Sequence, residues 1–83
     1  MITININDWK FMEVLDEGFR SLTEISLKLK LELSNVQKIY NKLNSWGILD
    51  QKKEGKIRYI WLNQTGLYFL SFYKKIKRRV KWK

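Results

Sequence analysis

The sequence predicts an α+β fold, mainly helical with one small β-hairpin, in a single domain spanning residues 1–83. The chain has 83 residues, of which 45% are hydrophobic and 14% aromatic, too many for a disordered segment. Apolar residues recur at helical spacing in much of the chain, and a glycine turn near residue 55 separates two short strand-like runs. With no proline, four glycines and no repeat, the sequence marks no internal domain boundary.

A short extended segment and a first helix are expected in the first 18 residues. Isoleucines alternate with polar residues at positions 2, 4 and 6, which predicts a strand or an extended arm. Asn7 or Asp8 can then cap a helix that ends at Gly18. The apolar side chains spaced for one face of this helix are Phe11, Val14 and Leu15.

A second helix is predicted to begin near Leu22. Ser21 and Glu24 have the spacing of a capping box, in which each side chain accepts a hydrogen bond from the other residue's backbone N–H. The strict alternation LKLKLEL over residues 27–33 is instead typical of a strand. Because leucine, lysine and glutamate are helix formers without β-branching, we expect a helix that ends near Lys30, followed by a turn.

The third predicted helix, over residues 33–46, is amphipathic. At 100° per residue one broad side of it is apolar, and Gly47 follows where a left-handed residue would end the helix. The apolar side consists of Leu33, Val36, Ile39, Tyr40, Leu43 and Trp46. The opposite side consists of Ser34, Gln37, Lys38, Asn41, Lys42 and Ser45. We expect the apolar side to pack on the core and the polar side to face solvent or a partner.

A β-hairpin is predicted after this helix. The segments 49–53 and 56–62 read as two strands around a tight turn at Glu54 and Gly55. One face of the second strand carries Ile57, Tyr59 and Trp61, which alternate with Arg58 and Ile60.

Asn63 can cap a last helix over about residues 64–83, because no helix-breaking residue follows Gly66. A helix of about 18 residues, roughly 27 Å long, extends beyond what so small a body can cover. Its apolar stripe therefore needs a partner, most simply the same helix of a second copy. This expected dimerisation stripe consists of Phe69, Phe72, Tyr73, Ile76 and Val80.

The positive charge is concentrated in the second part of the chain, whose formal net charge is +9 overall. Residues 1–50 carry six Lys/Arg and seven Asp/Glu, a net charge of −1, whereas residues 51–83 carry eleven and one, a net charge of +10. Such a field favours a polyanionic partner, either nucleic acid or an anionic membrane surface, although basic residues also serve simply to solvate a surface.

Composition excludes several functional classes. The chain has no Cys and no His, which rules out disulfides, Cys/His zinc sites, a cysteine nucleophile and histidine acid–base catalysis. It also has no glycine-rich phosphate loop, and its eight carboxylates lack the spacing of a metal or acid–base site. We therefore expect a protein that is not an enzyme and has no cofactor, metal or small-molecule ligand. Without a membrane-spanning apolar run or a signal-peptide pattern, it is expected to be intracellular and cytoplasmic.

The order helix, helix, turn, helix, hairpin, helix resembles that of winged helix-turn-helix domains. TEISLKLKLELSNVQKIYNKLNSWGIL is similar to the two helices, glycine and apolar pair that precede the wing. WLNQTGLYFLSFY is similar to the end of the wing and the next helix in small archaeal winged-helix regulators and in MarR-like and PadR-like repressors. The resemblance covers about residues 9–73. The sequence departs from it at Lys30, where the turn usually has glycine, and at Glu32, where a Ser or Thr cap is common.

This resemblance implies a transcriptional regulator that binds double-stranded DNA selectively as a homodimer, with residues 33–46 in the major groove. Gln37 and Asn41 can bond adenine edges, and Lys38 can reach a guanine or a phosphate. The expected contacts from this helix are Ser34, Asn35, Gln37, Lys38, Asn41 and Lys42. Any solvated helix carries such residues, so the DNA-binding role depends on the resemblance.

The hairpin, about residues 50–61, is the expected wing, which touches the DNA backbone or the minor groove. Its cations are Lys52, Lys53, Lys56 and Arg58. Cations near a hairpin tip also discourage strand pairing between molecules, and Arg58, farther from the tip, can simply cover a strand face. Trp46, Tyr59 and Trp61 suggest base stacking, but large rings in so small a domain are better explained as core.

The C-terminal run KKIKRRVKWK admits three roles: a dimer helix, a phosphate-binding tail, or a membrane-surface helix ending in Trp82. The apolar stripe favours the dimer, and a membrane is the least expected partner. Seven cations in these ten residues favour an antiparallel or splayed contact over a tight parallel one. Two alternatives to a selective regulator stay open: an architectural protein that coats DNA with little sequence preference, and a winged-helix adaptor that binds other proteins.

Overall fold

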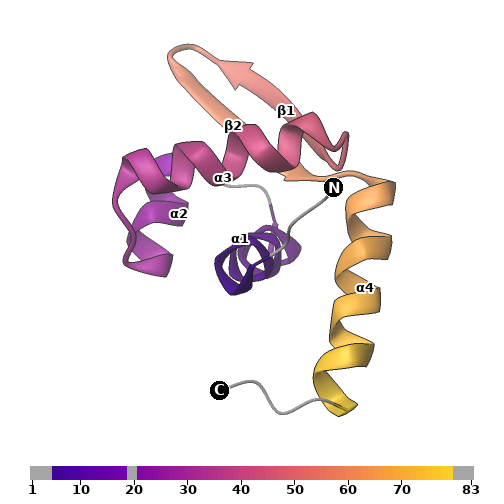
Figure 1. The fold of residues 1–83 in the computed structure, drawn as a ribbon. Helices are drawn as coiled ribbons and strands as arrows, with labels where there is room; N and C mark the ends of the chain where they lie inside the picture. Colours follow the sequence, from indigo (N-terminus) through magenta and orange to yellow (C-terminus); the bar gives the residue numbers. More distant parts are fainter. Residues whose placement is uncertain (1–4, 19–20, 80–83) are drawn as a thin grey trace.

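The computed structural model describes residues 5–18 and 21–79, which form helices and a two-stranded antiparallel sheet (Figure 1). The elements are α1 (Ile6–Asp16), α2 (Leu22–Leu29), α3 (Leu33–Ser45), β1 (Leu49–Glu54), β2 (Ile57–Leu62) and α4 (Gln64–Arg79). This order confirms the predicted α+β fold. The isoleucines at positions 2 and 4, together with Val80 and Trp82, lie outside the described residues.

Helix α1 begins earlier than predicted, because its N-cap is Asn5 and not Asn7 or Asp8. Asn5 Oδ1 accepts a hydrogen bond from the backbone N–H of Asp8, and Asp8 Oδ2 accepts one from the backbone N–H of Asn5, both at 3.0 Å. A cap at Asn7 would place Lys10 at the third helical position, and lysine has no acceptor to complete the box. Ile6, expected in the extended arm, is therefore the first helical residue.

Helix α2 confirms the predicted capping box. Ser21 Oγ accepts from the backbone N–H of Glu24 at 3.3 Å, and Glu24 Oε1 accepts from the backbone N–H of Ser21 at 3.4 Å. The helix ends where Lys30 adopts the left-handed conformation (φ 56°, ψ 41°). The LKLKLEL segment is thus the end of a helix, a turn and the start of α3, as predicted, and not a strand.

The core lies between helices α1 to α4 and one face of the hairpin. In Figure 1, α3 runs between the hairpin and α1, while α2 and α4 stand at opposite ends of the molecule. The side chains with no exposed surface include Phe11, Ile25, Val36, Leu43, Ile48 and Ile60. They come from α1, α2, α3, β2 and the residue before β1, so this single core fixes α3 relative to the hairpin.

The hairpin turns at Gly55 and Lys56, one residue later than predicted, because Gly55 supplies the positive φ (61°) that the turn needs. In the strand register Leu49, Gln51 and Lys53 pair with Leu62, Ile60 and Arg58. Paired residues project to the same face of a ladder, and on this face Leu49, Ile60 and Leu62 are buried. The alternate face, with Ile57, Tyr59 and Trp61, points away from the core.

Helix α4 packs against α1. The ring of Tyr73 stacks on the ring of Trp9 with 4.3 Å between the centroids, and Lys74 Nζ lies 2.8 Å from Asp16 Oδ2. Asn63 caps the helix as predicted, since its Oδ1 accepts from the backbone N–H of Gly66 at 3.0 Å. No helix within the described residues is both long and apolar enough to cross a lipid bilayer.

Candidate nucleic-acid interface

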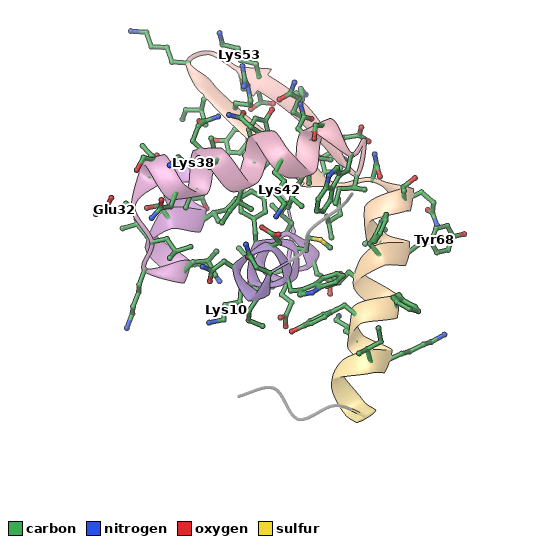
Figure 2. The ribbon with its side chains drawn as sticks, in the orientation of Figure 1. Lys10, Glu32, Lys38, Lys42, Lys53 and Tyr68 are labelled. Carbon is green, nitrogen blue, oxygen red and sulfur yellow. The ribbon has the colours of Figure 1, made fainter. Side chains whose placement is uncertain are left out.

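Helix α3 separates its side chains largely as predicted. Val36, Ile39, Tyr40 and Leu43 are buried. The Tyr40 hydroxyl donates to the side-chain oxygen of Gln51 on β1, which links the helix to the hairpin. Side chains expected to contact DNA are exposed on the outer side of α3: Ser34, Asn35, Gln37, Lys38 and Asn41. One side of α3 is therefore packed into the core, and the opposite, polar side, which carries Lys38 in Figure 2, faces away from the core.

The prediction that Leu33 belongs to the buried side is wrong. Leu33 is the first residue of α3 and is 51% exposed. Its backbone follows Glu32, an N-cap without a side-chain capping hydrogen bond, so the helix start stands at the edge of the body (Figure 2). No described part of the chain covers the exposed half of Leu33.

The two amides of the outer face are connected. Gln37 Nε2 donates to Asn41 Oδ1 at 3.1 Å. The two residues are one helical turn apart, the spacing at which side chains on a helix surface meet. This hydrogen bond sets the orientation of both amides before any partner arrives.

Lys42 does not join this polar surface. Its Nζ lies 2.7 Å from Asp8 Oδ2 and 5.5 Å from the ring centroid of Trp46. Figure 2 shows Lys42 directed from α3 towards α1. Lys42 stands on the border of the polar side of α3, and the packing of α1 against that border brings a buried carboxylate within reach. Lys42 is therefore paired within the domain, unlike the exposed residues of α3 that are expected to contact DNA.

The four hairpin cations are all exposed but lie on different faces. Lys53 and Arg58 are cross-strand partners. They lie on the same face of the hairpin as the buried residues Leu49, Ile60 and Leu62, but nearer to the turn. Lys56 is in the turn itself. Lys52 is on the outer face, where it pairs with Glu54 at 3.3 Å. The hairpin tip is thus cationic on both faces, with part of the Lys52 charge offset.

A groove of about 500 Å³ joins the hairpin tip to the start of α2 and α3. It is lined by Ser21, Leu22, Thr23, Leu33, Gln37, Lys56, Ile57 and Arg58. Three of these residues, Gln37, Lys56 and Arg58, are among the DNA contacts predicted from the sequence. Leu33 and Ile57 are not, because their hydrophobic character predicts burial. Only their positions at the ends of α3 and β2 indicate that they could be exposed.

The hairpin aromatics, Tyr59 and Trp61, do not line this groove. Tyr59 and Trp61 are half-buried and, with Lys52 and Glu54, line an open hollow on the outer face of the hairpin. They are not core residues, contrary to the expectation. Tyr40 and Phe11 are in the core, and Trp46 is half-buried against it.

The expected dimerisation stripe is divided by the fold. Tyr73 is buried in its own chain, and Phe69 and Ile76 are half-buried. Phe72 is 62% exposed, and Tyr68, which points away from the body in Figure 2, is exposed as well. Thr65, Tyr68, Phe69 and Phe72 line a shallow, almost wholly apolar hollow of about 250 Å³.

The sequence matches no protein-family model and no curated protein, whereas the structure has many similar solved structures. The homodimeric winged helix-turn-helix DNA-binding domain of Mb0332 from Mycobacterium bovis is 15% identical, with a TM-score of 0.81 over 94% of this chain and 73% of that chain. The adhesin competence repressor AdcR from Streptococcus pyogenes is 14% identical, with a TM-score of 0.84 over 94% and 59%. FabT from Streptococcus pneumoniae, solved in complex with DNA, is 16% identical, with a TM-score of 0.80 over 92% and 56%.

This chain spans less than two thirds of the length of AdcR and FabT, so the likeness concerns one portion of those proteins. Within that portion, α2 and α3 correspond to the helix-turn-helix, and β1 and β2 to the wing. Identities of 14 to 16% over nearly the whole of this chain, with TM-scores of 0.80 or more, show that the architecture is shared while the sequence is not. The chain therefore has the winged helix-turn-helix fold.

Proposed function

We propose that this protein binds double-stranded DNA with sequence selectivity, as a homodimer, and regulates transcription. The observation that carries the proposal is the groove that joins α3 to the wing. Gln37 from α3 and Lys56 and Arg58 from the wing line the same groove. A duplex seated on the outer side of α3 would meet a base-reading amide and phosphate-binding cations together.

The fold of the chain supports this proposal. In helix-turn-helix proteins the second helix enters the major groove and its N-terminal residues contact base edges. Here that helix is α3, whose outer side is polar and uncovered by the described chain. Two of the similar structures, the Mb0332 domain and FabT, are described as DNA-binding or as bound to DNA.

The proposed affinity comes mainly from cations and the selectivity from α3. Lys53, Lys56 and Arg58 on the wing and Lys38 on α3 are exposed, and each can neutralise a phosphate. The sequence has seven further Lys/Arg in residues 74–83, one of which, Lys74, pairs with Asp16. Two copies related by a two-fold axis, with their α3 helices about 34 Å apart, would read a site with two-fold symmetry.

A binding titration tests the proposal. Duplexes enriched from a random pool are labelled, and their affinity is measured by fluorescence anisotropy at several salt concentrations. We expect log K to fall linearly with log salt, by about 0.9 per phosphate neutralised, and unrelated duplex DNA to compete roughly a thousandfold more weakly. Affinity that does not depend on salt contradicts DNA binding, and equal competition by unrelated DNA indicates an architectural protein.

Two matched variants localise the surface. Lys38→Ala removes an exposed cation from α3 and should weaken binding. Lys10→Ala removes an exposed cation from α1, on the side of the body away from the hairpin (Figure 2), and should leave binding unchanged. Equal effects of the two variants would place the DNA on another surface.

A further inference from the structure

We propose that Leu33 and Gln37 read neighbouring A·T base pairs, with Leu33 against the C5 methyl group of a thymine and Gln37 on the major-groove edge of an adenine. The inference rests on the proposed function and names the class of DNA sequence that the site selects.

Leu33 is a leucine where a solvated surface would carry a polar residue. It is 51% exposed, is the first residue of α3, and lines the groove with Ile57. The first residues of a recognition helix are those nearest to the base edges. In the major groove the thymine methyl is the apolar group that distinguishes an A·T pair from a G·C pair. Contact with it would remove both apolar surfaces from water.

Gln37 lines the same groove one helical turn after Leu33. Its Nε2 donates one hydrogen bond to Asn41 Oδ1 at 3.1 Å. An amide nitrogen carries two N–H groups, so Gln37 retains a second donor and its carbonyl acceptor. Those are the two groups that a bidentate contact with adenine N7 and N6 requires. The bond to Asn41 holds the amide in place, which reduces the ordering needed on binding.

The composition of α3 disfavours the reading of G·C pairs. Its sequence, LSNVQKIYNKLNS, contains no Arg for guanine and no Asp or Glu for the cytosine amino group. Of its two lysines, Lys42 is paired with Asp8 inside the domain, which leaves Lys38. Leu33 and Gln37 are four residues apart, a spacing at which helical side chains have Cβ atoms about 5–6 Å apart. Base pairs stack about 3.4 Å apart, so two side chains at this spacing are close enough to reach adjacent base pairs.

The test uses the duplex with the highest affinity from the random-pool selection, made once with thymine and once with deoxyuridine in its place. Deoxyuridine lacks the C5 methyl group and keeps the base-pairing edge. For the unaltered protein we expect the thymine duplex to bind more tightly, by about fourfold for each methyl group contacted. Leu33→Ala should bind both duplexes equally. Leu27→Ala, which alters a leucine that is 74% exposed on α2 and outside the groove, should preserve the difference.

The outcomes separate this inference from the proposed function. Tight, salt-dependent binding without any preference for thymine over deoxyuridine overturns the methyl contact and leaves DNA binding intact. A preference that persists in Leu33→Ala also overturns it, because another group must then contact the methyl. A selected site without adjacent A·T pairs overturns the whole inference. Failure to bind any duplex contradicts the proposed function itself.

Discussion

Lys42 Nζ lies 2.7 Å from Asp8 Oδ2, so a lysine of α3 is paired with a carboxylate of α1 in its own domain. The Asp8 side chain is 1% exposed, and the same oxygen also accepts from the backbone N–H of Asn5. Asp8 Oδ1 is buried and has no hydrogen-bond partner among the residues that the structure describes. The carboxylate thus depends on Lys42 for its counter-charge, and the pair links the start of α1 to the last turn of α3.

Replacing Lys42 by methionine should destabilise the fold. Loss of Lys42 leaves the buried Asp8 carboxylate without its counter-charge, and because Lys42 itself is only half-buried the free energy of unfolding should fall by about 1–3 kcal/mol. Urea denaturation followed by circular dichroism measures the change. The double variant Asp8→Asn/Lys42→Met should be more stable than Lys42→Met alone, because the unpaired charge is then gone. A single variant as stable as the unaltered protein would contradict this account of the pair.

The same pair predicts how Lys42 affects DNA binding. Log K falls as log salt rises. If Lys42 contacted a phosphate, its removal would make this fall less steep, by about 0.9 in the slope. Because Lys42 is held by Asp8, we expect Lys42→Met to leave that slope unchanged at a temperature where the variant is folded. Lys38→Met should make the slope less steep by the amount of one phosphate contact, since Lys38 is exposed. Anisotropy titrations on the unaltered protein, Lys42→Met and Lys38→Met measure the three slopes and show which lysine contacts a phosphate.

The role of Lys42 shows which features the sequence could predict. Short-range rules predicted the Ser21/Glu24 box, the end of α2 at Lys30 and the cap at Asn63, because every partner lies within a few residues. The periodicity of α3 also placed Lys42 on the polar side. Its partner is 34 residues away, and only the packing of α1 on α3 brings the two together.

The same limit applies to Tyr73 and to the hairpin. The period of α4 put Tyr73 on an apolar stripe, but the position of Trp9 determines which part of that stripe is buried. In β2 the alternation alone could not tell which face meets the core, and Ile60 and Leu62 are buried where Tyr59 and Trp61 were expected. Local signals therefore predicted the elements and the exposure of most polar side chains on α3, while the burial of other side chains depended on how the elements pack.

Lys30→Gly should stabilise the protein. Lys30 has a φ of 56° and is the one non-glycine residue with positive φ among those that the structure describes. The left-handed conformation costs a residue with a Cβ about 1–2 kcal/mol, whereas glycine loses about 0.5–1 kcal/mol in chain entropy. The net gain should be about 0.5–1 kcal/mol in the free energy of unfolding. Lys28→Gly is the control, because it lies within α2 and should destabilise the helix.

Gly66→Ala should destabilise the protein although alanine is the better helix former. A Cβ on Gly66 would lie 2.4 Å from the carbonyl oxygen of Ile48 and 2.9 Å from a methyl of Leu62. Because the nearest atom belongs to the backbone, α4 would have to move away from the strands, and overpacking of this kind typically costs about 1–3 kcal/mol. Thermal unfolding measures the loss. A variant with an unchanged or higher melting temperature would show that α4 is not held so closely.

Phe72→Glu should prevent the proposed dimer. Phe72 and Tyr68 are exposed large aromatics beside a hollow lined almost wholly by apolar groups, whereas Tyr73 is committed to the core of its own chain. Sedimentation equilibrium of the unaltered protein should therefore give a dimer. Because the two copies are related by a two-fold axis, each would place a glutamate in the contact, so two acidic side chains would oppose association.

The dissociation constant of the Phe72→Glu dimer should rise about tenfold or more, as expected for the loss of a central aromatic contact. Leu27→Glu makes the same apolar-to-acidic change on α2, away from α4, and should leave the dimer intact. Because an added acid on α4 also lowers the positive field, Phe72→Ala serves as an uncharged second variant and should weaken the dimer in the same direction. Equal weakening by Leu27→Glu would show that the change in net charge, and not the apolar face of α4, controls assembly.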